Sequence, residues 1–226
     1  MAVIPLVRID WTPCWRIIPS RFPIVDLYER IAPPQDWSVL QEIETLTNER
    51  VLTDRGKAPH IRAEDRGANA MSSLILAPFC HPDPNGDQFS DGTFGISYAL
   101  PTFEAALMRS VRSREQFLRQ TKEGPITLQT RVLKTDMSGM LHDIRGKIAN
   151  DYRDTTACRE LCRTLRADGS YGLVYEDHFQ TIGTTVAAFR PTILSNFRQE
   201  RHLAYKWDGI RISEVYDYSN GDTRSM

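Results

Sequence analysis

The chain has 226 residues, of which 41% are hydrophobic and 25% charged. This composition suffices for one sizeable hydrophobic core, so we expect a single domain over residues 1–226. The formal net charge of −1 excludes a nucleic-acid binder that relies on broad electrostatic attraction. No run of 18 apolar residues is present, and the N-terminus lacks the basic and apolar regions of a signal peptide. We therefore expect no membrane span and a cytoplasmic location.

The N-terminal part, residues 1–70, is predicted to be partly extended and partly helical. Residues 15–23 contain two prolines, which favour an extended chain. Residues 26–32 fit a helical turn, and residues 37–48 carry the apolar stripe of a helix. The polar segment 49–69 shows little periodicity, and we expect it to be a long loop that covers a pocket.

The predicted core, residues 71–218, begins with an apolar segment over residues 71–79 that fits a buried strand or a short helix. A proline- and aspartate-rich turn follows, and three glycines then occur within residues 86–95. Glycine has no Cβ, so these positions allow tight turns or a close approach to a ligand. Residues 94–98 alternate between large apolar and small or polar side chains, which predicts a short strand. A loop, a strand and a helix in this order commonly build a ligand pocket.

Residues 102–120 form the clearest predicted helix. Thr102 fits an N-cap, because its hydroxyl can accept a hydrogen bond from the first turn. Apolar side chains follow at helical spacing and define the face expected to be buried. They are Phe103, Ala106, Leu107, Val111 and Phe117.

The remainder of the core alternates between strands and one helix. Residues 126–133 predict a strand, residues 154–167 a helix, and residues 171–176 and 185–190 two further strands. Several strands adjoin one another along the chain instead of each being separated by a helix. This favours an α+β fold, with a mixed sheet flanked by helices, over a doubly wound parallel sheet.

The C-terminal region predicts a hairpin. Asp208-Gly209 is a strong two-residue turn signal between the apolar segments 203–207 and 210–216. The tail over residues 219–226 is polar, and we expect it to be frayed.

The four cysteines are spread along the chain at Cys14, Cys80, Cys158 and Cys162. The last two lie one helical turn apart, but the five histidines form no tight cluster with them. We therefore predict buried structural thiols and no metal site.

Several segments, taken in order, resemble the RES-domain family. These bacterial toxins are named for an arginine, a glutamate and a serine. The similarity is carried by residues 15–23 (WRIIPSRFP), 89–99 (FSDGTFGISYA), 189–191 (FRP), 194–196 (LSN), 202–205 (HLAY) and 207–209 (WDG). The resemblance covers nearly the whole chain. It implies a core related to ADP-ribosyltransferase folds, NAD⁺ as the substrate of hydrolysis or phosphorolysis at the glycosidic bond, and a helix-turn-helix antitoxin as partner.

The family chemistry has a clear physical basis. Breaking the nicotinamide–ribose bond builds positive charge on the ribose, so a nearby carboxylate stabilises the transition state more than the ground state. A guanidinium can hold the pyrophosphate through two hydrogen bonds. An aromatic ring positions the nicotinamide or the ribose.

This chain departs from the family at all three signature positions. The motif's arginine falls at Gln88, the helix glutamate at Arg109, and the serine after the strand at Asp177, whereas the tyrosine is kept as Tyr98. The candidate catalytic residues are therefore Tyr98, Arg109 and Asp177.

The candidate ligand-binding residues are Gln88, Tyr98, Arg16 and Arg21. A glutamine can hydrogen-bond a phosphate but carries no charge, so Arg16 and Arg21 are candidates to replace the lost cation. Taken alone, Tyr98 also fits a core residue.

Relative to the family pattern, the helix over residues 102–120 has a basic residue in place of an acid at Arg109. The end of the strand over residues 171–176 has gained an acid at Asp177. We hypothesise that Arg109 and Asp177 pair across the former catalytic pocket and weaken or alter the activity. In a rival hypothesis, Asp177 or Glu176 supplies the carboxylate of a rewired enzyme. Taken alone, Arg109 also fits a solvated helix arginine. Two further alternatives are an inactive RES-fold module that binds an NAD-like ligand or a protein, and an enzyme that transfers ADP-ribose to protein.

Overall fold

The computed structural model of the chain describes residues 4–20, 65, 73–146, 155–177 and 183–226. The predicted helical turn, helix and loop between residues 26 and 69 lie outside the described residues, apart from Asp65. Asp65 is buried and accepts two hydrogen bonds at 2.7 and 3.0 Å from Nη2 and Nε of Arg190. This ion pair joins Asp65 to Arg190, which lies two residues after the strand that ends at Ala188.

The described elements mix helices and strands as predicted. In chain order they are β1 (Leu6–Pro19), α3 (Ser73–Cys80), β2 (Ser97–Ala99), α4 (Phe103–Thr121), β3 (Ile126–Asp143), α5 (Thr155–Ala167), β4 (Gly172–Glu176), β5 (Thr184–Ala188), the 3-10 helix η4 (Pro191–Ile193), β6 (Leu194–Trp207), β7 (Ile212–Asp217) and β8 (Thr223–Ser225). The apolar segment predicted over residues 71–79 thus contains a short helix, α3, which is one of its two predicted forms.

All of these strands belong to one sheet, in the order β2-β5-β4-β3-β6-β7-β8, with β1 paired to β3. The β3–β4 pair is parallel and the other pairs are antiparallel. The α+β class with a mixed sheet is therefore confirmed.

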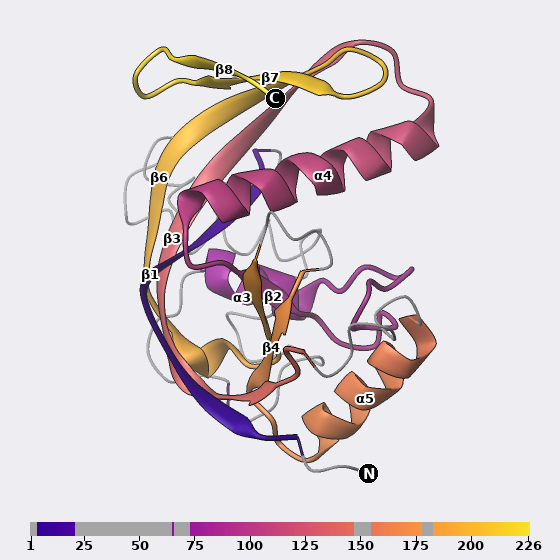
Figure 1. Ribbon diagram of the computed structural model, residues 1–226, viewed down its shortest axis with the longest axis vertical. Helices are drawn as coiled ribbons and strands as arrows, with labels where there is room; N and C mark the ends of the chain where they lie inside the picture. The colour runs from indigo at the N-terminus through magenta and orange to yellow at the C-terminus, as the bar shows by residue number, and fades with distance from the viewer. Residues whose placement is uncertain (1–3, 21–64, 66–72, 147–154, 178–182) are drawn as a thin grey trace, which may run out of the picture.

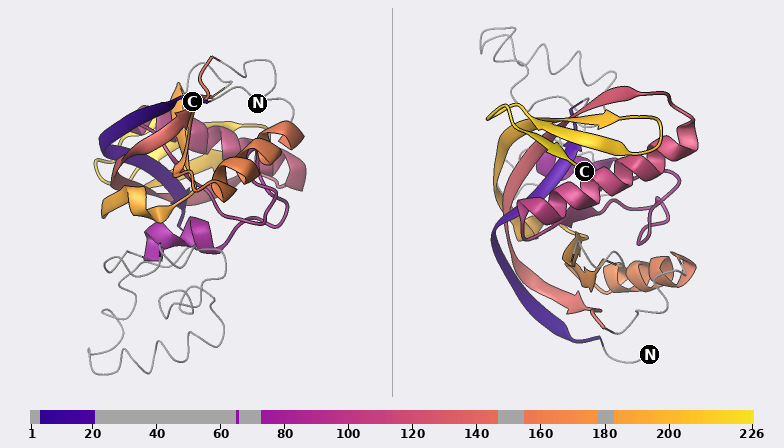
Figure 2. Two further views of the ribbon diagram at one scale, coloured as in Figure 1. Left: turned by 90° about the horizontal axis from the view of Figure 1, so that it is seen from below. Right: turned by 45° about the horizontal axis from the view of Figure 1, so that its top comes forward.

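The long strands β1, β3 and β6 curve together along one side of the molecule, and α4 and α5 lie on the side toward which they bend (Figures 1 and 2). The bending has a local cause, because the pairing register shifts within β1–β3 and twice within β3–β6. Such bulges add a residue to one strand and sharpen its bend.

Helix α4 forms as predicted, with one change on its buried face. Thr102 caps it by accepting a hydrogen bond from the Ala105 N–H at 3.2 Å. Leu107, Val111 and Leu118 are buried, whereas Phe117 is 50% exposed. Leu118 lies two helical turns beyond Val111 and therefore shares its face, which Phe117 does not.

Four other predictions need correction. The short strand is β2 at Ser97–Ala99 and does not span residues 94–98, because only these three residues pair with β5. Strands β3 and β6 are much longer than the predicted 126–133 and 203–207, because they pair with each other and β3 also pairs with β1. The hairpin turn spans residues 208–211, where Asp208 Oδ1 accepts the N–H groups of Ile210 and Arg211. The tail is not simply frayed, since Thr223–Ser225 forms β8 and pairs with β7.

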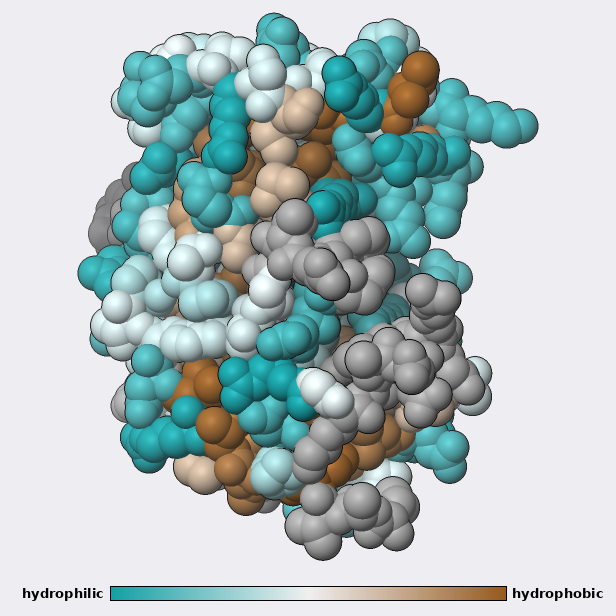
Figure 3. Space-filling model, viewed as in Figure 1, coloured by the Kyte–Doolittle hydropathy of each residue, from teal (hydrophilic) through white to brown (hydrophobic). Residues whose placement is uncertain are grey.

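All four cysteines are free and buried, as predicted. Burial raises the pKa of Cys14 to about 12, so its thiol stays protonated and unreactive at neutral pH. In the part of the chain that the structure describes, no helix is both long and apolar enough to cross a membrane. The face seen in Figure 3 is mostly hydrophilic, with apolar side chains visible between the polar ones.

Candidate functional site

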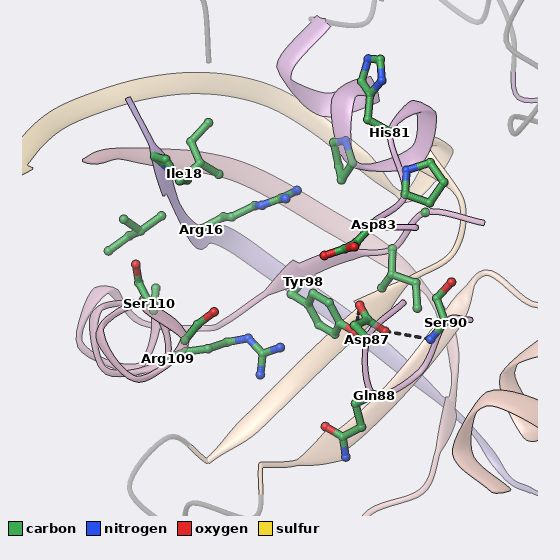
Figure 4. A pocket seen from close by; sticks show the side chains of 18 of the residues that line it. Arg16, Ile18, His81, Asp83, Asp87, Gln88, Ser90, Tyr98, Arg109 and Ser110 are labelled. Carbon is green, nitrogen blue, oxygen red and sulfur yellow. Dashed lines mark hydrogen bonds between the residues drawn. The ribbon is translucent and has the colours of Figure 1, made fainter. Parts of the chain in front are cut away.

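A pocket of about 450 Å³ lies between β1, α4 and the loop that runs from α3 to β2. Its volume falls within the range of small-molecule sites. Four predicted residues line it, namely Arg16, Gln88, Tyr98 and Arg109. Figure 4 shows Arg16 reaching in from β1 and Arg109 from α4, with Tyr98 between them and the loop. Arg21 lies outside the described residues.

The loop keeps its shape through glycine and through an aspartate-centred turn. Gly95 packs so tightly that a Cβ there would lie 1.9 Å from the Pro78 carbonyl oxygen of α3. Asp87 Oδ1 accepts the backbone N–H groups of Phe89 and Ser90, each at 2.8 Å. Side-chain acceptors of this kind fix a turn locally. The loop thus holds Asp87 and Gln88 at the pocket wall.

Helix α5 ties the same loop down from outside. Arg159 Nε donates to the Asp87 carbonyl oxygen at 2.7 Å. Arg163 pairs with Asp91 one turn further along the helix. These contacts fix the backbone next to Gln88 and on both sides of the Asp87 turn.

Tyr98 is held from two directions. Its hydroxyl donates to Asp87 Oδ2 at 2.6 Å, and the Arg109 guanidinium carbon lies 4.3 Å from its ring centroid. Burial, reinforced by the Asp87 charge, raises the pKa of Tyr98 well above its ordinary value. The phenol therefore stays protonated at neutral pH and can keep donating to Asp87.

Arg109 also forms the ion pair that the charge exchange predicted. Its Nη1 donates to Asp177 Oδ2 at 2.8 Å, across 68 positions of sequence. The side chain of Asp177 is 5% exposed and that of Arg109 is 26% exposed. Burial alone would lower the pKa of Arg109, but Tyr175, Tyr98 and Asp177 together raise it above the ordinary value. The guanidinium therefore stays charged.

Asp177 lies behind Arg109 and is not among the residues that line the pocket. Its N–H donates to the Gly183 carbonyl oxygen at 3.1 Å, which anchors it just after β4. Glu176 is exposed and does not line the pocket either. The geometry therefore brings Arg109 to the pocket wall and keeps both predicted acids away from it.

Arg16 carries a positive charge with little compensation. Its Nη1 donates to Ser97 Oγ at 3.0 Å, and it forms no ion pair with any acid of the described residues. Burial and the nearby Arg109 charge lower the pKa of Arg16 to about 10, so it remains protonated at pH 7. A half-buried cation of this kind is stabilised when an anion enters the pocket.

Asp87 is a pocket residue that the sequence reading missed. The sequence does indicate a structural role for it, because an aspartate at the start of a glycine-rich turn commonly accepts hydrogen bonds from the following backbone. Its neighbour Gln88 is the residue that falls at a signature position of the family. No group of three or more His, Cys, Asp or Glu side chains suited to a metal ion occurs within the described ranges.

The family model described as RES domain matches residues 62–208. The chain belongs to the RES domain family. This RES protein is similar to the uncharacterized protein y4oC of Sinorhizobium fredii, with 34% identity over 208 residues that cover 91% of this chain and 87% of the relative. Among solved structures it is similar to a chain of the MbcT–MbcA toxin–antitoxin complex of M. tuberculosis. That match has a TM-score of 0.44 and 10% identity, and it covers 86% of each chain.

Proposed function

We propose that this RES protein binds NAD⁺ or a related nucleotide in the pocket and cleaves the glycosidic bond of NAD⁺ very weakly or not at all. One observation carries the proposal. The Arg109–Asp177 ion pair, at 2.8 Å, occupies the two positions where the family resemblance places a glutamate and a serine.

The charge at Arg109 opposes cleavage. The departing nicotinamide leaves positive charge on the ribose, and a carboxylate beside the ribose would stabilise that charge. A guanidinium at the same wall raises the barrier, because it repels the developing cation. The one new acid, Asp177, is engaged behind Arg109 and is not at the wall.

The features suited to binding are still present. The volume of about 450 Å³, the charge of Arg16 and the ring of Tyr98 together fit part of a nucleotide with phosphate groups. The relation of the family to ADP-ribosyltransferase folds supports the same ligand class. Gln88 adds an uncharged hydrogen-bonding group where the family has an arginine.

A second candidate is a rewired enzyme, favoured by Asp87. This carboxylate lines the pocket and bonds the Tyr98 hydroxyl at 2.6 Å. In this scheme Asp87 stabilises the ribosyl cation, whether the acceptor is water, phosphate or a protein side chain. Both of its oxygens already accept hydrogen bonds, which disperses the charge that it would offer.

A protein partner follows from family membership as part of the same proposal. RES toxins are expected beside a helix-turn-helix antitoxin, so a small protein of that kind is the proposed partner here. Expression of this chain alone should leave growth unaffected if cleavage is weak. Growth arrest that the neighbouring gene relieves would instead favour the rewired enzyme.

The binding half is tested by isothermal titration of the purified protein with NAD⁺, NADH and ADP-ribose. We expect at least one of them to bind, and Arg16→Gln to weaken that binding about tenfold, because the positive charge at the pocket wall is lost. Arg119→Gln serves as the matched control, since Arg119 lies on α4 and pairs with Glu115 but does not line the pocket. Absence of binding by all three nucleotides would overturn the proposal.

A further inference from the structure

The exchange of charges alters which nicotinamide ring the pocket can accept. Arg109 covers one face of the Tyr98 ring at 4.3 Å, so that electron-rich face is already occupied by a cation. Arg16 lines the same pocket and interacts unfavourably with Arg109. A third positive group near Tyr98 would meet both guanidinium charges.

Positive charges outnumber negative charges among the side chains that line the whole pocket. Three arginines and two aspartates line it, together with His81; they are Arg16, Arg109, Arg114, Asp83 and Asp87. The two acids are not equivalent. Asp87 already accepts hydrogen bonds at both oxygens, and Asp83 is exposed at the rim and accepts from Asn85. The strongest compensation of Arg109 comes from Asp177, which lies behind it and away from the cavity.

Oxidised and reduced nicotinamide nucleotides differ by one positive charge on the ring and hardly at all in size. Both carry the same pyrophosphate, which suits the Arg16 guanidinium equally well. The difference in their affinities therefore measures the field that the pocket applies to the ring. A pocket with a carboxylate on α4 would favour the cationic ring, and one with Arg109 there disfavours it.

We propose that the pocket selects a nucleotide with a pyrophosphate and an uncharged ring, so that NADH binds in preference to NAD⁺. This selectivity rests on the proposed function, because it assumes that the pocket holds a nicotinamide nucleotide. Such a site would bind the reduced nucleotide, whereas the family chemistry cleaves the oxidised one.

The wild-type protein alone can test the inference. Titrations with NADH and NAD⁺ at the same ionic strength should give a dissociation constant about tenfold lower for NADH. Equal affinities, or tighter binding of NAD⁺, would overturn the selectivity and leave the proposed function standing. If neither nucleotide binds while ADP-ribose does, the selectivity also fails. If none of the three binds, both proposals fail.

Variants then assign the effect to Arg109. Arg109→Gln combined with Asp177→Asn removes both charges but keeps hydrogen-bonding groups, and the preference should fall to about twofold or less. The matched control is Arg119→Gln with Glu115→Gln, an ion pair of the same helix that does not line the pocket, and it should keep the wild-type ratio. A wild-type ratio in the Arg109 pair variant would show that Arg109 does not set the preference.

Discussion

Restoring the three signature residues together, as Gln88→Arg, Arg109→Glu and Asp177→Ser, is expected to raise nicotinamide release from NAD⁺ by about 100-fold or more. The new glutamate would lie at the pocket wall, where Arg109 now lies, and would stabilise positive charge on the ribose. The serine removes the acid behind it, so that the glutamate is not repelled. Release is followed by chromatography of free nicotinamide at saturating NAD⁺.

The matched control is Arg109→Glu alone. This single change places a glutamate against Asp177, whose oxygen now lies 2.8 Å from Arg109, and two close carboxylates repel each other. We expect little gain from it. A folded triple variant with no more activity than the wild type would contradict the view that these positions hold the lost catalytic groups.

Breaking the ion pair from one side is expected to cost stability. In Asp177→Ala the Arg109 guanidinium stays in the pocket wall without its acid, and we expect the free energy of unfolding to fall by about 2 kcal/mol. Replacing both partners, Arg109→Met with Asp177→Leu, should cost much less, because no charge is then left without compensation. Urea unfolding of the three proteins measures the difference.

An exposed pair on the same sheet provides the comparison for stability. Arg8 and Asp10 pair at 2.7 Å, but their side chains are 64% and 53% exposed, so Asp10→Ala should leave the free energy of unfolding nearly unchanged. If Asp177→Ala were as mild as Asp10→Ala, the ion pair would not be the structural element proposed here.

The chain keeps the RES domain, but the Arg109–Asp177 pair occupies two of the family's signature positions. Both partners sit where the resemblance expects catalytic groups, yet together they form a satisfied contact between α4 and the end of β4. Arg16 and Tyr98 remain at the pocket, and α5 still fixes the loop through Arg159. Under the proposed function, the residues suited to binding are present at the pocket and the carboxylate suited to bond cleavage is not.

Local signals made part of the fold predictable. The cap at Thr102 and the apolar stripe defined α4, and Asp208-Gly209 located the hairpin. The second half of β3 escaped prediction, because Lys134 and Asp136 interrupt its alternation. That segment is a strand since β1 and β6 both pair with it, and such long-range pairing leaves little trace in a local pattern.

The candidate site, like the fold, was predictable only in part. Pairing of Arg109 with Asp177 was predictable, because two family positions exchanged complementary charges. The contact between Tyr98 and Asp87 was not, since it depends on how the loop turns between them. The stacking of Arg109 on Tyr98 depends in turn on the angle at which α4 crosses β2, which sequence spacing does not specify.

The account is tested most directly by incubating the purified wild-type protein with NAD⁺ and measuring nicotinamide and intact NAD⁺ over many hours. We expect the nucleotide to be recovered intact, with nicotinamide no higher than in a protein-free sample. Repeated turnover that Asp87→Asn abolishes would contradict the account, because the pocket would then hold a working carboxylate.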